Sequence, residues 1–252
     1  MTFKVGGYLP EICDNFQELE CSLIMKSSGD YEIPQYTPIS NQGQLSSCVG
    51  TSLGDCIELL IGIKNPSKVQ QISRLFIYYN SRKYHNATHK DAGTYISNAM
   101  ESLIKYGICL ESNWIYDPLK VNKQPSLKAY KQAKDNEFKI GAYYQIKNNS
   151  NKLSSIESAI RSNHPVIFGV DIGQEYLGYK GKDKIFNPPT KSIGGHAQLI
   201  IGVKYINNQR CWVIRNSWGT SFGNKGYALF SDEYITTARD CFVLSFDKDL
   251  VV

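Results

Sequence analysis

The hydrophobic pattern changes character near residue 139, and this change most limits how the chain can fold. Before it, apolar residues recur at helical spacing, as Leu53, Ile57 and Leu60 do. After it, short β-branched and aromatic runs separated by turn residues predict strands. With 252 residues and 42% hydrophobic content, the chain can bury a core as one large domain or two small, closely packed ones. The pattern therefore predicts an α+β protein, with a helical half followed by a strand-rich half.

Three helices are expected in the first half. They span Cys48 to Gly62, Ser73 to Arg82 and Thr94 to Lys105. Gly107 follows the third helix at a position where a left-handed residue commonly ends a helix. The segment from Asp117 to Lys139 is rich in Lys, Gln and Pro, so we expect it to be the crossing between the halves.

The second half is expected to consist mainly of strands. These are Lys139 to Ile146, Val166 to Ile172, His196 to Tyr205, Cys211 to Arg215 and Gly226 to Phe230. Ser154 and Glu157 match a capping box and predict a short helix that ends near Ser162. Gly173 to Ile193 is expected to be a long polar loop.

Cys48 stands at the start of the first predicted helix. Backbone N–H groups and the helix dipole favour negative charge there, and the thiolate is the reactive form of cysteine. Gln42 lies six residues earlier, near enough for its amide to donate to an oxyanion beside Cys48. Most single cysteines are small buried hydrophobic residues. This stretch alone therefore leaves both interpretations open.

Two later segments offer partners for the thiol. His196 opens a predicted strand after two glycines, and Asn216 follows the strand that ends at Arg215. Nucleophilic catalysis by cysteine needs a base within hydrogen-bond reach and a third group to orient that base. Each residue alone has a structural explanation, but Cys48, His196 and Asn216 together favour a catalytic site.

These segments resemble the active-site blocks of the papain/cathepsin cysteine peptidases. The blocks are Gln42-Gly43 with Cys48, Gly195-His196-Ala197 and Asn216-Ser217-Trp218-Gly219-Thr220. Further matches extend the resemblance from about Ile33 to Phe246. The sequence around Cys48 is closer to that of microbial and viral members than to that of animal cathepsins.

The resemblance implies a papain-like two-lobed fold, with a helical lobe, a β-barrel-like lobe and the cleft between them. Residues 30–125 would form the mainly helical lobe with Cys48. Residues 126–252 would form the strand-rich lobe with His196 and Asn216.

The same resemblance implies a cysteine endopeptidase that uses a thiolate–imidazolium pair and a thioester acyl-enzyme. Gln42 and the backbone N–H of Cys48 would form the oxyanion hole, and Trp218 would shield the hydrogen bond between His196 and Asn216. Neither a metal nor an organic cofactor is required. The expected partner is a peptide or protein substrate.

Substrate-binding residues are also implied. They are Ser46, Ser47, Gly93, Tyr95, Gly169, Gly194, Gly195 and Trp218. Gly93 would pair with extended substrate backbone. Tyr95, Gly169 and Gly194 would surround the pocket for the residue two positions before the scissile bond, and no charge is evident among them. We therefore expect a preference for bulky apolar or aromatic residues there.

Residues 1–29 precede the family-like core and form an N-terminal leader too short to fold alone. The leader could lie along the cleft, because Gly6-Gly7 permits close backbone approach and Leu9 and Pro10 offer apolar anchors. A leader that packs on the body or frays is an equally open alternative.

Composition argues against several other classes of protein. The net charge of +5 is mild and the lysines are scattered among acids, so neither nucleic acid nor a membrane surface is expected as a partner. The seven cysteines include no CxxC pair, which argues against a zinc site, and the six besides Cys48 are expected to be mostly free. No secretory signal is evident, which favours a cytoplasmic or particle-associated location over secretion.

Two functional alternatives stay open. The same triad can transfer an acyl group to another acceptor, as in ligation or transglutamination. A catalytically silent binding protein on the same fold is the other, although the intact set of Cys48, His196, Asn216 and Gln42 argues against it. The sequence does not indicate an oligomeric state.

Overall fold

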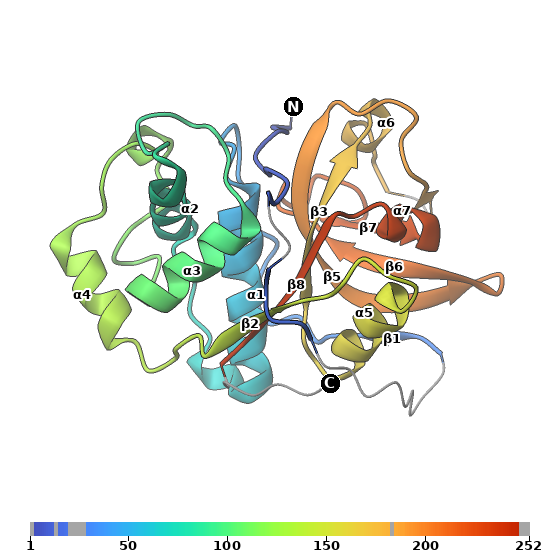
Figure 1. The fold of residues 1–252 in the computed structure, drawn as a ribbon, viewed down its shortest axis with the longest axis horizontal. Helices are drawn as coiled ribbons and strands as arrows, with labels where there is room; N and C mark the ends of the chain where they lie inside the picture. Colours follow the sequence, from blue (N-terminus) through green and yellow to red (C-terminus); the bar gives the residue numbers. More distant parts are fainter. Residues whose placement is uncertain (1–2, 13–14, 20–28, 182–183, 247–252) are drawn as a thin grey trace.

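The computed structural model describes residues 3–12, 15–19, 29–181 and 184–246. The helices formed by residues 48–135 gather on one side, the strands and the remaining helices lie on the other, and the leader runs between the two sides (Figure 1). The predicted α+β fold is therefore confirmed.

The helical half contains α1 (Cys48–Lys64), α2 (Arg74–Arg82), α3 (Ile96–Tyr106) and α4 (Leu127–Asp135), with single 3-10 turns at Pro66–Lys68, Lys83–His85 and Pro118–Lys120. The first three helices lie within two residues of their predicted bounds, and Gly107 ends α3 with a φ of 83°. The segment predicted as a crossing contains α4, whose Ala129 and Ala133 join a buried cluster with Leu75 and Phe76 of α2. Part of that segment therefore belongs to the helical half.

Helix α1 is the centre of the molecule. Its residues from Cys48 to Gly62 are buried, as expected for a helix enclosed on all sides. Gly50 allows α2 to approach, since a Cβ atom there would lie 2.9 Å from the carbonyl oxygen of Arg74. The Ser52 hydroxyl donates to the carbonyl oxygen of Ala197 at 3.1 Å, which ties α1 to the strand that carries His196.

The strand-rich half is one mixed sheet. Its strands are β1 (Tyr31–Glu32), β2 (Ala142–Gln145), β3 (Val166–Ile172), β4 (Ile185–Phe186), β5 (Gly194–Ile206), β6 (Gln209–Arg215), β7 (Tyr227–Ser231) and β8 (Asp240–Ser245). The order is β2-β8-β3-β5-β6-β7-β4, with β1 paired to β5, and β4–β7 is the parallel pair. Strands β2 and β4 stand at opposite ends of this order, so the described sheet is open and does not close into the expected barrel-like form.

Three further helices accompany the sheet: α5 (Lys152–Arg161), α6 (Gln174–Leu177) and α7 (Asp232–Thr236). The predicted capping box is wrong, because Ser154 donates to the carbonyl oxygen of Asn151 and Glu157 pairs with Arg161 and Arg210. The segment predicted as a polar loop holds both α6 and β4.

The pairing of the strands places candidate site residues from neighbouring strands at one end of the sheet. His196 on β5 lies opposite Val170 on β3, and Gly169 on β3 lies opposite Asp240 on β8. Asn216 directly follows β6, the other neighbour of β5. Strand β5 also reaches the start of α1, because the N–H of Ala197, directly after His196, faces the sulfur of Cys48.

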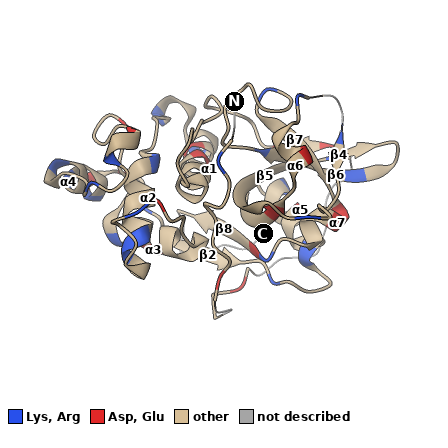
Figure 2. Ribbon diagram, turned by 90° about the horizontal axis from the view of Figure 1, so that it is seen from above, with Lys and Arg blue, Asp and Glu red and all other residues tan. Residues whose placement is uncertain are grey.

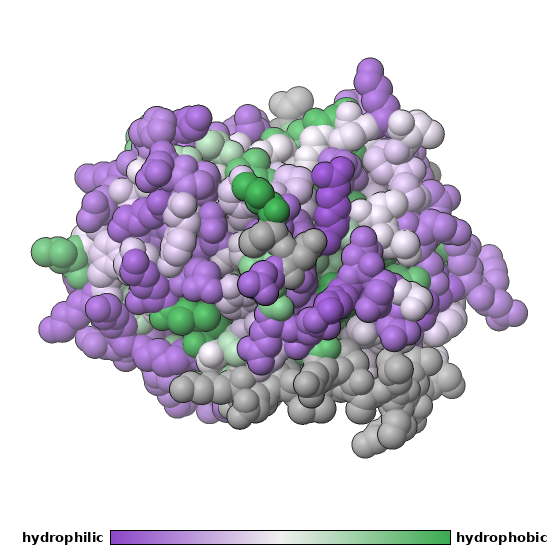
Figure 3. Space-filling view, in the orientation of Figure 1, coloured by the Kyte–Doolittle hydropathy of each residue, from purple (hydrophilic) through white to green (hydrophobic). Residues whose placement is uncertain are grey.

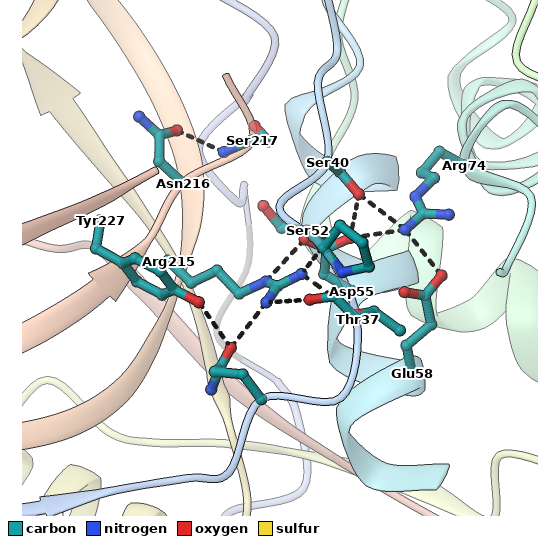
Figure 4. A network of polar contacts seen from close by, with 12 residues as sticks. Thr37, Ser40, Ser52, Asp55, Glu58, Arg74, Arg215, Asn216, Ser217 and Tyr227 are labelled. Atoms are coloured by element: carbon teal, nitrogen blue, oxygen red, sulfur yellow. Dashed lines mark hydrogen bonds and ion pairs between the residues drawn. The ribbon is translucent and has the colours of Figure 1, made fainter. Parts of the chain in front are cut away.

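A buried network of charges joins the two halves (Figure 4). Asp55 of α1 accepts from Arg74 of α2 at 2.9 Å and from Arg215 of β6 at 3.0 Å. Arg74 also meets Glu58 of α1 at 2.8 Å, and Arg215 reaches the side-chain oxygen of Gln35 at 2.7 Å. Burial acts to raise the pKa of Asp55, but the two arginines outweigh it and hold that pKa below its ordinary value.

The surface is polar and mixed in charge. Basic and acidic residues are interspersed over both halves (Figure 2). The face that carries the leader is mostly hydrophilic, with hydrophobic side chains in small separate groups (Figure 3). Within the described residues, no helix combines the length and the apolar character needed to cross a membrane.

We expect Asp55→Asn to lower the free energy of unfolding by about 3–5 kcal/mol, because it leaves two buried arginines short of a counter-charge. Urea unfolding measures this change. As a control, Lys184→Met breaks the exposed ion pair with Glu175 and should cost less than about 1 kcal/mol. Equal costs for the two variants would contradict the role given to Asp55.

Candidate active site

Cys48 occupies the first position of α1. Ser47, the residue before it, makes no side-chain cap, and the first turn carries no acidic residue. The backbone N–H groups of Cys48, Val49 and Ala197 face the sulfur and act to lower the pKa of the thiol. The thiol is fully buried, however, and burial is the larger effect, raising its pKa to about 12.

His196 is oriented by Asn216. Its Nε2 lies 2.8 Å from Asn216 Oδ1, and its ring stacks on Trp218 with centroids 4.5 Å apart. This leaves Nδ1 without a hydrogen-bond partner. The thiol of Cys48 lies against the N–H of Ala197, the residue after His196. The arrangement therefore provides a nucleophile, a base with one free nitrogen and a group that orients the base.

Burial also acts on His196. It lowers the pKa of the imidazole to about 4, against a smaller raising effect from the Asn216 hydrogen bond. Burial also raises the pKa of the Cys48 thiol, so both shifts favour the neutral forms of the two groups in this covered state.

Gln42 is held by the residue after Asn216. Its Oε1 accepts from the Ser217 hydroxyl at 2.6 Å, and its backbone N–H donates to the Ser217 carbonyl oxygen at 2.8 Å. Its amide nitrogen donates to the carbonyl oxygen of Leu45 at 2.8 Å. An amide nitrogen carries two hydrogens, so one stays available for an oxyanion.

The leader explains why Cys48 is buried. Gly6 donates to the carbonyl oxygen of Gly195 at 2.9 Å, and Thr94 donates to that of Gly7 at 3.0 Å. A Cβ atom on Gly7 would lie 2.8 Å from Cys48 Sγ and 2.5 Å from the carbonyl oxygen of Ser46. The backbone of the leader therefore passes so close to the nucleophile that only glycine fits.

Aromatic side chains anchor the leader on both sides of Gly7. Phe3 stacks on Trp218 with ring centroids 4.8 Å apart, and Tyr8 is buried on the other side. The expected anchors are not the main ones, since Leu9 is only half-buried and Pro10 is exposed. The sequence did not predict Tyr8 as an anchor, although it directly follows the two glycines.

Further along, the leader packs on the body. Gln145 of β2 donates to the carbonyl oxygen of Gln17 at 2.8 Å, and Leu19 donates back to that of Gln145 at 3.0 Å. Phe16 packs edge-on against Phe242 of β8. The part of the leader around Gly7 thus lies along the cleft, and the part from Phe16 to Leu19 packs on the body, so each of the two predicted arrangements describes one part of the leader.

Tyr8 occupies a pocket that contains Gly169 and Gly195, two of the predicted substrate-binding residues, and one residue that was not predicted. A Cβ atom on Gly169 or Gly195 would lie 2.1 or 2.9 Å from the Tyr8 ring, so the two glycines make the space for it. The Tyr8 hydroxyl donates to the carboxylate of Asp240, and burial first and Asp240 second raise the pKa of that hydroxyl. The three residues predicted around this pocket carry no charge, but the structure adds the Asp240 carboxylate, which the prediction did not include.

The other predicted substrate-binding residues have varied surroundings. The N–H of Ser46 donates to Asp91 at 3.0 Å, and the Ser47 hydroxyl lies 2.6 Å from that of Tyr116. Gly194 lies beside Gly6, and the Tyr95 ring packs edge-on against His85.

Gly93 was expected to pair with substrate backbone. Its N–H donates to the Tyr78 hydroxyl at 3.0 Å, and the leader pairs instead with the next residue, Thr94. A Cβ atom on Gly93 would meet the carbonyl oxygen of Gly7 at 2.7 Å.

The sequence pattern described as "Papain family cysteine protease" matches residues 27–243. The chain belongs to this family. An uncharacterised peptidase C1-like protein of Acanthamoeba polyphaga mimivirus is 30% identical over 242 residues, which are 93% of this chain and 75% of that protein. Cathepsin K of Gallus gallus is 25% identical over 217 residues, 84% of this chain and 60% of that protein.

Solved papain-family structures resemble this chain closely. Xylellain, a cysteine protease from Xylella fastidiosa, gives a TM-score of 0.81 at 28% identity and 97% coverage of both chains. A digestive procathepsin L from Tenebrio molitor gives a TM-score of 0.72 at 21% identity, covering 97% of this chain and 76% of that one, and shares the fold.

We expect Gly7→Ala in the full chain to expose Cys48, because the added methyl group has no room beside Sγ. Alkylation of Cys48 by iodoacetamide, followed by mass spectrometry, should become about tenfold faster or more, as overpacking typically costs about 1–3 kcal/mol. Pro10→Ala, at an exposed leader position, is the control and should react like the unaltered chain. Unchanged alkylation of Gly7→Ala would mean that the leader does not limit access.

Proposed function

We propose that this papain-family protease is an endopeptidase. The observation that carries the proposal is the path of the leader. This polypeptide passes over Cys48, with Phe3 beside Trp218 on one side of Cys48 and Tyr8 on the other side. A groove that holds chain on both sides of the nucleophile can accept an internal peptide bond. An exopeptidase needs one side closed or a group that binds a chain end.

In the proposed reaction the Cys48 thiolate attacks the scissile carbonyl carbon. Gln42 and the N–H of Cys48 stabilise the oxyanion, and His196 gives its proton to the leaving amine as the C–N bond breaks. Water, deprotonated by His196, then attacks the thioester, and the products are a carboxylic acid and the free thiol. Asn216 keeps the imidazole in place throughout, and Trp218 covers that hydrogen bond.

The leader would block this reaction without being cleaved itself. The leaving amine must face His196, so a substrate runs from the Thr94 side toward Trp218. The leader runs the opposite way, from Phe3 at Trp218 to Leu9, which donates to the Thr94 carbonyl oxygen. Its peptide bonds are therefore reversed over Cys48. The likeness to a procathepsin fold is in keeping with such a covering segment.

We expect the catalytic variants to differ in severity. Cys48→Ala and His196→Ala should abolish turnover of a peptide substrate, and Gln42→Ala should lower kcat on the order of a hundredfold, as loss of one oxyanion donor does. Asn216→Ala should be milder, because Asn216 takes no proton. A loss for Asn216→Ala as large as for Cys48→Ala would contradict this division of roles.

Product masses separate the open alternatives. Hydrolysis adds one water across the cleaved bond, whereas acyl transfer to an added amine gives a product joined to that amine. Hydrolysis products at saturating amine support the peptidase. Amine adducts as the main product would establish a transferase. In the chain without residues 1–23, the absence of any product together with unreactive Cys48 would establish a silent binding protein.

A further inference from the structure

Asp240 lies at the floor of the pocket that Tyr8 fills. It is buried, it starts β8, and its Oδ2 accepts both from the Tyr8 hydroxyl and from the backbone N–H of Glu11, the latter at 3.0 Å. Both donors belong to the leader. Whatever replaces the leader in this pocket must therefore satisfy the Asp240 carboxylate again.

The position of the pocket relative to Cys48 defines which substrate residue enters it. Gly7 lies over Cys48, and the next residue, Tyr8, occupies the pocket. In a substrate, the residue over Cys48 supplies the scissile carbonyl. Its neighbour on the amino-terminal side, two positions before the scissile bond, then takes the place of Tyr8.

The shape of the pocket is that of a flat ring. Gly169 and Gly195 have no side chains to fill the space that the Tyr8 ring occupies, and Ala197 belongs to the same buried cluster. Beside Tyr8, an open cavity of about 370 Å³ carries the exposed Asp171 and Arg239 at its edge. Because these two exposed charges are opposite in sign, the buried carboxylate of Asp240 is the group that distinguishes one ring from another.

We propose, on the basis of the proposed endopeptidase function, that Asp240 makes this enzyme select tyrosine two residues before the scissile bond. A phenylalanine there would bury the Asp240 carboxylate without a donor, which is costly. A tyrosine restores the hydrogen bond that Tyr8 makes. A guanidinium also donates, but the glycine-lined space fits a ring.

The first test compares peptides that differ only at this position, with Tyr, Phe, Leu or Arg, in a full chain that carries Tyr8→Ala to withdraw the leader's own ring. The expected kcat/KM for the Tyr peptide exceeds that for the Phe peptide by about 10- to 100-fold, the usual contribution of a hydrogen bond to a charged group. Asp240→Ala should bring this ratio close to one. Asp240→Asn keeps an acceptor and should give an intermediate ratio.

A ratio near one in the chain with Asp240 would overturn the proposal, as would an Arg peptide preferred over Tyr. A Tyr preference that survives Asp240→Ala would equally assign the selectivity to other residues.

A second test needs no catalysis, so it separates this inference from the proposed function. The Thr94 and Leu9 amides are protected by leader hydrogen bonds, and their hydrogen exchange reports release of the leader. Tyr8→Phe and Asp240→Ala should each speed that exchange about 10-fold or more, and the double variant should be no faster than Asp240→Ala alone. Additive effects would show that the hydroxyl and the carboxylate act separately, and would overturn the proposal even if peptides are cleaved.

Discussion

The buried carboxylate of Asp55 between two arginines is the contact on which the active-site geometry depends. It joins α1, which carries Cys48, to Arg215, and Arg215 directly precedes Asn216. This ion pair therefore links the helix that begins at Cys48 to the strand that ends directly before Asn216. Such a pair is costly to desolvate, so its contribution is to position the two halves more than to stabilise them.

The leader acts on the same site by burial. It passes over Cys48 and stacks on Trp218, which itself covers His196. Burial raises the pKa of the Cys48 thiol and lowers that of the His196 imidazole. Both shifts favour the neutral pair, whereas the proposed reaction starts from thiolate and imidazolium. In the proposed mechanism, leader release returns water to Cys48 and weakens the largest cause of the thiol shift. The leader would then both block substrate and disfavour the reactive charge state.

Sequence alone could predict the features that depend on local patterns. The bounds of α1 follow from its apolar spacing. The structure also brings together Cys48, His196 and Asn216, the three residues that the sequence predicts to be catalytic. Features that depend on pairing between distant segments could not be predicted. The open order of the sheet, the contact of Tyr8 with Asp240 across 232 positions and the Asp55–Arg215 pair across 160 are of this kind. Asp240 also lies after the last of the three active-site blocks that carried the resemblance, so none of those blocks identifies it.

The most direct measurement is the rate at which a peptidyl epoxide labels each cysteine, with and without residues 1–23. In the truncated enzyme Cys48 should be labelled rapidly and the buried Cys56, Cys109, Cys211 and Cys241 should stay unlabelled, while in the full chain labelling of Cys48 should be slow. A truncated enzyme that is folded by circular dichroism, yet labels Cys48 no faster than the full chain or no faster than another cysteine, would contradict this account.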